Sequence, residues 1–136
     1  MKEAKAGCAY FAVVFAMGFV FGTVRALVGR QAPGVPEWAL VLVEVPLMLT
    51  ASWWVCGWLV RRFEVPAVTG VRVVMGGVAL GLLLLAEQAV GIVLMRRTIE
   101  QQVSSYTSAG ALIGLAAQIV FAAFPLVRAR AEKRAR

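Results

Sequence analysis

Three ionisable side chains lie inside long apolar stretches of this 136-residue chain: Arg25, Glu44 and Glu87. A charge in the bilayer centre costs at least about 2.5–3.5 kcal/mol, so such groups usually face the interior of a helix bundle and find partners there. An arginine between two glutamates can bridge them and fix the positions of the helices. A carboxylate left over can instead bind a proton or a cation, because paired carboxylates in a low-dielectric site retain a proton tightly.

The depths of the three groups favour a shared site. Alternate spans run in opposite directions, so the end of the first span, the start of the second and the end of the third lie on the same side of the membrane. At about 1.5 Å per residue, Arg25 lies about 5 Å, Glu44 about 9 Å and Glu87 about 12 Å from that side. Two amides, Gln88 and Gln118, lie in the same apolar stretches. We therefore expect these five residues to form one intramembrane polar cluster.

Glycines share helical faces with these polar residues. Small residues let helix backbones approach closely in a membrane, where interhelical packing and hydrogen bonds drive association. We therefore expect the glycine faces to be the helix-packing surfaces. The glycines concerned are Gly18 and Gly22 near Arg25, Gly77 and Gly81 near Glu87, and Gly110 and Gly114 near Gln118.

Pro46 follows Glu44 by two residues. Proline has no backbone N–H, so the carbonyl of Leu42 loses its helical partner, which a membrane protein tolerates when neighbours or water satisfy that oxygen. A kink beside an embedded carboxylate predicts a hinge at Pro46, although prolines that only bend a helix are also common in membrane spans.

The elements that position these groups are four apolar stretches. A bilayer core of about 30 Å requires about 20 apolar residues in a helix. Hydrophobic residues make up 61% of the chain, whereas soluble domains have about 45–50%. The sequence therefore predicts an all-α membrane protein, a four-transmembrane-helix bundle that forms one domain over residues 1–136. The predicted spans are residues 8–28, 38–60, 73–95 and 109–127.

The distribution of Lys and Arg predicts the orientation. Ten of the 14 cations lie in the N-terminus, in the second connection and in the tail, whereas Arg30, Arg96 and Arg97 flank the other ends of the spans. Loops rich in Lys and Arg stay in the cytoplasm, which gives an N-in/C-in topology. The small size and short loops are typical of the bacterial inner (plasma) membrane.

The basic tail, residues 128–136, carries five cations. Each cation near an anionic membrane surface contributes about 1 kcal/mol, so the tail can bind anionic lipids. The same charges also serve as a topology signal. Because the cations flank the spans and do not form one patch, we expect the lipid bilayer as partner and no nucleic acid.

The residues that are absent exclude several kinds of site. The chain has no His and no Asp, so a His-ligated haem and a Ser-His-Asp triad cannot be built within it. Cys8 and Cys56 belong to no metal-ligand or redox spacing. We expect no enzyme, no cofactor and no metal site.

The sequence leaves two possible functions. The first is a non-enzymatic accessory or assembly subunit whose Arg25/Glu44/Glu87 cluster is structural and which binds a second copy or another membrane protein. The alternative is a small oligomeric transporter or channel that uses Glu44 and Glu87 as a proton or cation site.

Overall fold

The computed structural model describes residues 1–136 and is entirely helical. Four of its helices are long and apolar enough to cross a membrane, which confirms the predicted all-α class with four candidate spans. Each helix is longer than its predicted apolar stretch, because the polar residues that flank the stretch also adopt helical backbone conformation. The long helices are α1 (Lys2–Gln31), α2 (Glu37–Arg62), α3 (Thr69–Ala89, continued by the π-helical turn η1, Val90–Leu94) and α5 (Ala109–Arg134).

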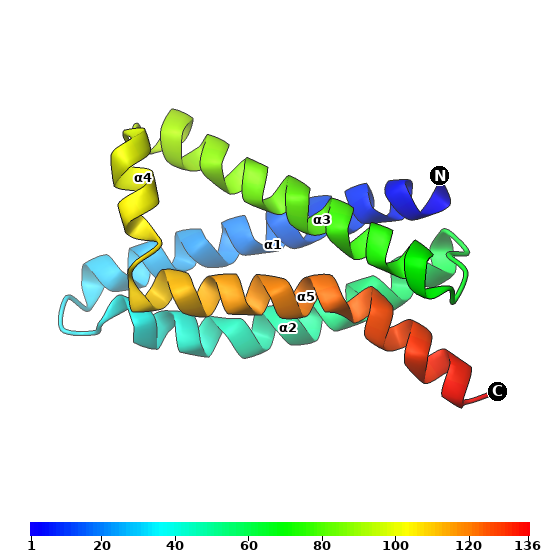
Figure 1. Cartoon of the computed structure of the whole chain (residues 1–136). Coiled ribbons are helices and arrows are strands. Elements are labelled where there is room, and N and C mark those ends of the chain that lie inside the picture. The colour runs from blue at the N-terminus through cyan, green and yellow to red at the C-terminus, as the bar shows by residue number, and fades with distance from the viewer.

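The long helices form a four-sided bundle (Figure 1). Helix α1 packs against α2 and α3, and α5 packs against the same two helices. Both chain termini and the α2–α3 connection lie at one end, here called the basic end (Figure 1). The α1–α2 connection and a short helix, α4 (Ile99–Ser105), lie at the opposite end, here called the α4 end.

Helix α4 lies in the connection between the third and fourth predicted spans. It begins with a capping box, in which the Gln101 backbone N–H donates to Thr98 Oγ1 (3.2 Å) and the Thr98 N–H donates to Gln101 Oε1 (3.0 Å). The side chain of Gln102 is buried against Gly91 of η1. Helix α4 crosses the direction of the long helices at their end (Figure 1).

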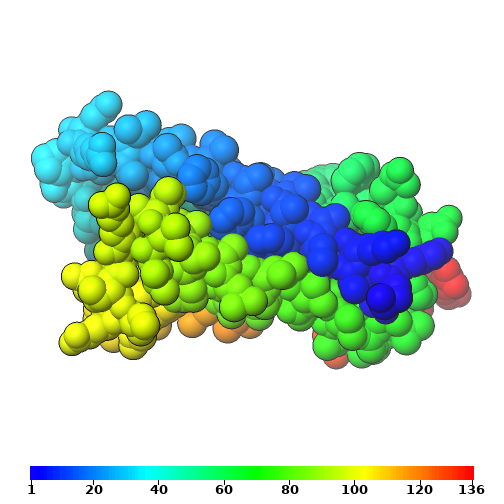
Figure 2. All heavy atoms as spheres, turned by 90° about the horizontal axis from the view of Figure 1, so that it is seen from above, coloured from blue at the N-terminus to red at the C-terminus, as the bar shows by residue number.

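The hydrophobic core is concentrated toward the basic end. Tyr10, Cys56 and Met75 are fully buried there. Of the 21 buried residues, only Val41, Gly91 and Gln102 lie near the α4 end. Helices α1 and α3 lie side by side over one face (Figure 2), and their ribbons separate toward the α4 end (Figure 1). The four helices therefore hold together most tightly toward the end of the bundle that carries both termini.

The closest approaches between backbones occur at Gly7 and Gly76, both at the basic end. A Cβ atom at Gly7 would lie 2.7 Å from the carbonyl oxygen of Met75, so α1 and α3 touch there. A Cβ atom at Gly76 would overlap the carbonyl oxygen of Ala122, so α3 and α5 touch there. Only glycine fits at these two positions without moving a helix.

The glycines predicted to pack occupy looser surroundings. Gly77, Gly81 and Gly114 have no neighbouring atom within 4 Å of the position of a Cβ atom. Gly18, Gly22 and Gly110 meet their nearest atoms at ordinary contact distances of 3.6–4.0 Å. Close packing therefore occurs at different glycines from the six predicted. Gly77 and Gly81 lie on an exposed side of α3, and the other four lie in the half of the bundle away from the core.

Candidate intramembrane polar site

Arg25 and Glu44 form an ion pair between α1 and α2. The Nη1 atom of Arg25 donates to Oε2 of Glu44. Their side chains are 31% and 15% exposed, so the pair is largely enclosed by the two helices. A paired and partly buried arginine can remain charged inside an apolar stretch. The pair fixes the position of α1 relative to α2 near the α4 end.

Glu87 lies in a second pair, between α3 and α5. The Nε2 atom of Gln118 donates to Oε1 of Glu87 at 2.5 Å, and both side chains are partly buried. An amide donor satisfies one carboxylate oxygen without adding a charge. This contact joins α3 to α5 in the same half of the bundle.

Gln88 belongs to a third pair. Its Nε2 atom donates to the hydroxyl oxygen of Tyr106, the residue that follows α4. The contact ties the end of the third span to the segment between α4 and α5. Although Gln88 is adjacent to Glu87, the two side chains leave the helix in directions about 100° apart, so their partners differ.

The five predicted polar residues therefore form three separate pairs. Arg25 contacts Glu44, and no ion pair joins it to Glu87. The sequence placed all three at similar depth, but depth alone does not fix which helices are neighbours. Because α1 and α3 separate toward the α4 end, Glu87 is bound from α5 instead (Figure 1).

Pro46 lies inside α2, which runs from Glu37 to Arg62. The hydroxyl of Thr50 donates to the carbonyl oxygen of Pro46 at 2.7 Å. This oxygen differs from the carbonyl oxygen of Leu42, which loses its helical N–H partner to the proline. The hinge at Pro46 stays a prediction. Pro125 lies inside α5 and is fully buried. That helix changes direction along its last third (Figure 1).

Arg72 is a structural residue that the sequence analysis counted only as a loop cation. It is 1% exposed and donates from Nε to the carbonyl oxygen of Pro66 (3.0 Å) and from Nη2 to that of Val65 (2.9 Å). The same Nη2 donates to Oε2 of Glu132 (3.0 Å). Arg72 thus joins α3, the α2–α3 connection and the end of α5. A buried position three residues into the helix gave no signal in the sequence.

Arg128, predicted to begin a free tail, packs into the bundle. Its guanidinium lies 4.0 Å from the centre of the Trp53 ring, and Nη2 donates to the Trp53 carbonyl oxygen at 2.6 Å. The guanidinium also lies directly over Gly57, where a side chain would collide with it. Helix α5 continues through the predicted tail as far as Arg134, and Ala129 is buried.

No protein-family model, curated protein or solved structure matches this chain.

Proposed function

We propose that this is a non-enzymatic integral membrane protein that acts by association within the membrane, as an accessory or assembly subunit. Its spans cross a bacterial inner membrane with both termini and the basic end in the cytoplasm. The observation that carries the proposal is an open small-residue face on α3, whose glycines have no neighbour within 4 Å. The polar pairs have a structural role beside it.

The pairing of the embedded charges supports a structural role. Arg25 neutralises Glu44 across α1 and α2, and Gln118 binds Glu87 across α3 and α5. Each contact joins two neighbouring helices, as a residue that fixes helix positions does. A transporter would instead need one of these carboxylates to release its side-chain partner and bind the transported proton or cation in its place.

The open face of α3 supports association. Gly77 and Gly81 are both exposed and lie one helical turn apart, as in the GxxxG pattern of helix dimers. They point away from Gly76, which contacts α5 inside the bundle. A second copy of the chain is the simplest partner for this face, because each copy would present the same surface.

The test is the mass of the full chain in mild detergent, measured by native mass spectrometry. We expect a dimer for the wild type and for Gly114→Leu, which enlarges another open glycine on α5. Gly81→Leu should yield folded monomer. A wild type that is monomeric at every protein-to-detergent ratio, or a Gly81→Leu variant that still dimerises, would contradict association through this face.

The transport alternative is tested with the same protein in liposomes. The proposal predicts that proton and cation flux stays at the level of empty liposomes. A flux above that level which disappears in folded Glu87→Gln protein would instead establish the transporter, with Glu87 as its ion-binding group.

A further inference from the structure

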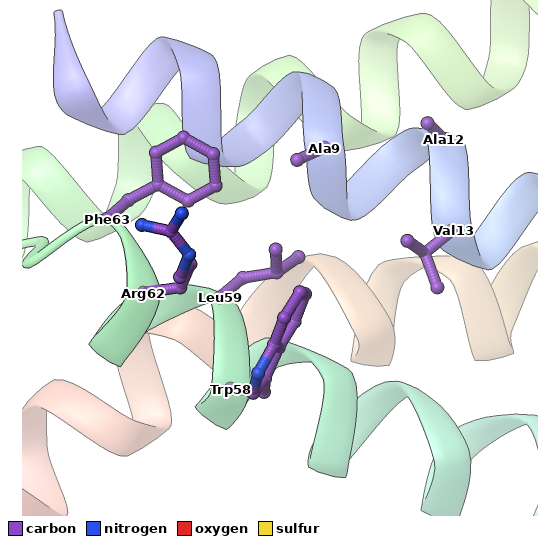
Figure 3. Close-up of a pocket in the computed structure, with 7 residues that line it drawn as sticks. All are labelled: Ala9, Ala12, Val13, Trp58, Leu59, Arg62 and Phe63. Carbon is purple, nitrogen blue, oxygen red and sulfur yellow. The ribbon is translucent and has the colours of Figure 1, made fainter.

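A groove between α1 and α2 opens on the side of the bundle near the basic end. Its volume is about 400 Å³. Ala9, Ala12 and Val13 line it from α1, and Trp58, Leu59, Arg62 and Phe63 line it from α2 and its C-cap (Figure 3). The groove exists because the alanines leave space opposite the large side chains of α2.

The chemistry of the groove changes along its length. Six of its seven lining residues are apolar, and the seventh is Arg62. Figure 3 shows the Arg62 guanidinium next to Phe63, at the end of the groove away from Val13. Trp58 lies one turn before Arg62, about 6 Å along the helix axis. An apolar channel thus ends at a cation, one helical turn from an indole ring, and both groups are typical of the level where hydrocarbon meets headgroups.

The positive charge of Arg62 is available to a ligand. Arg62 is exposed, and neither it nor the adjacent Arg61 takes part in an ion pair. The nearby carboxylates are engaged elsewhere: Glu64 binds Lys2 at 3.1 Å, and Glu3 binds the N-terminal amine at 2.9 Å. An anionic group near Arg62 therefore meets an uncompensated cation.

We propose that this groove binds one anionic phospholipid, with an acyl chain along Ala9, Ala12 and Trp58 and the headgroup phosphate on Arg62. A basic residue at the end of a crevice between transmembrane helices is a typical site for such headgroups. Guanidinium groups match phosphate oxygens with two parallel N–H donors. The site is separate from the α3 face and does not depend on association.

Trp58 supplies a direct readout, because bromine atoms on an acyl chain quench a nearby indole. The full chain in vesicles should show more quenching by brominated phosphatidylglycerol than by brominated phosphatidylcholine. Replacing Trp58 by Phe should remove this difference while the other three tryptophans still emit. An equal difference in Trp58→Phe protein would overturn the site.

Two matched pairs of variants test the headgroup and the chain separately. Arg62→Gln should weaken the preference for the anionic lipid about tenfold, because it removes the charge-assisted hydrogen bonds to the headgroup phosphate. Arg61→Gln removes the same charge from the neighbouring position and should change it less than twofold. Equal effects of the two variants would mean diffuse attraction to the basic end and would overturn the proposal.

The chain position is tested by filling the groove. Ala12→Leu should reduce quenching of Trp58 by the brominated chain, whereas Ala16→Leu, one turn along α1 and outside the groove, should not. If Ala12→Leu leaves the quenching unchanged, the acyl chain does not occupy the groove and the proposal fails. Circular dichroism of each variant verifies that its helices are retained.

Discussion

At the basic end helix backbones touch each other and buried side chains reinforce these contacts, whereas at the α4 end the helices are joined through side chains. Gly7 and Gly76 bring α1, α3 and α5 into backbone contact at the basic end. The Tyr10 hydroxyl donates to the Phe121 carbonyl at 3.1 Å, which links α1 to α5 across the bundle. Near the α4 end, the links are the ion pair of Arg25 and the amide contact of Glu87.

The difference separates two ways of stabilising helices in a membrane. Backbone contact between small residues supplies dispersion attraction that is lost when the helices move apart by a fraction of an ångström. Long polar side chains can follow such a movement and keep their hydrogen bond. The basic end therefore sets the fold, and the α4 end can change its helix spacing without losing its polar partners.

The largest expected effect is at Arg72, which holds the basic end together from inside. Arg72→Gln removes the donors to the carbonyl oxygens of Val65 and Pro66 and the ion pair with Glu132. Leaving these carbonyl oxygens without their charged donor costs about 1.5–3 kcal/mol, whereas Glu132, whose side chain is 44% exposed, is solvated once Arg72 is gone. We expect the free energy of unfolding, measured by titration with sodium dodecyl sulfate in mixed micelles, to fall by that amount.

Arg97→Gln is the control, because Arg97 is exposed at the α4 end and forms no ion pair. This change should shift the unfolding free energy by less than about 0.5 kcal/mol, as most surface substitutions do. If both substitutions had equally small effects, the basic end would not depend on Arg72.

The next largest effect is expected at Gly76. This glycine is packed against α5, whereas the adjacent Gly77 is open, so substitutions at the two positions compare a packed with an open surface of one helix. Gly76→Ala forces α3 away from the Ala122 carbonyl and should destabilise by about 2 kcal/mol, the usual cost of overpacking. Gly77→Ala meets open space, and alanine favours a helix over glycine by up to about 1 kcal/mol, so stability should hold or rise. Unfolding of both variants in the same micelles measures the contrast. A larger loss of stability for Gly77→Ala would contradict the orientation of α3 in which Gly76 faces α5 and Gly77 does not.

Hydropathy was sufficient to predict the four spans, because each is long and apolar whatever its neighbours. The pairing of Arg25 with Glu44 is consistent with two charges at similar depth on consecutive helices. The contrast between Gly76 and Gly77 lay beyond the sequence, because α3 has only apolar residues and glycines between Arg72 and Glu87, and this pattern does not show which side faces α5. Arg72 was equally hidden, since two of its partners are backbone carbonyls and the third, Glu132, lies 60 residues away.

The capping box of Thr98 and Gln101 is a signal that sequence reasoning could have used. A Thr followed three residues later by Gln is typical of a helix N-terminus, and α4 begins there. The position of α4 across the bundle end has no such signal, because it involves the side chain of Gln102 lying against Gly91 of η1.

The smallest effect is expected at the α4 end, from the coupling of Arg25 to Glu44. A double-mutant cycle of Arg25→Gln, Glu44→Gln and the double variant should give a coupling energy of about 1 kcal/mol, since polar contacts inside membrane bundles average about 0.6 kcal/mol and reach about 1.7. The double variant should be more stable than the sum of the single losses predicts, because it leaves no unpaired charge in the apolar stretch. The same micelle titration measures all four proteins. A coupling above about 3 kcal/mol would place the α4 end on a par with Arg72 and remove the distinction between the two ends.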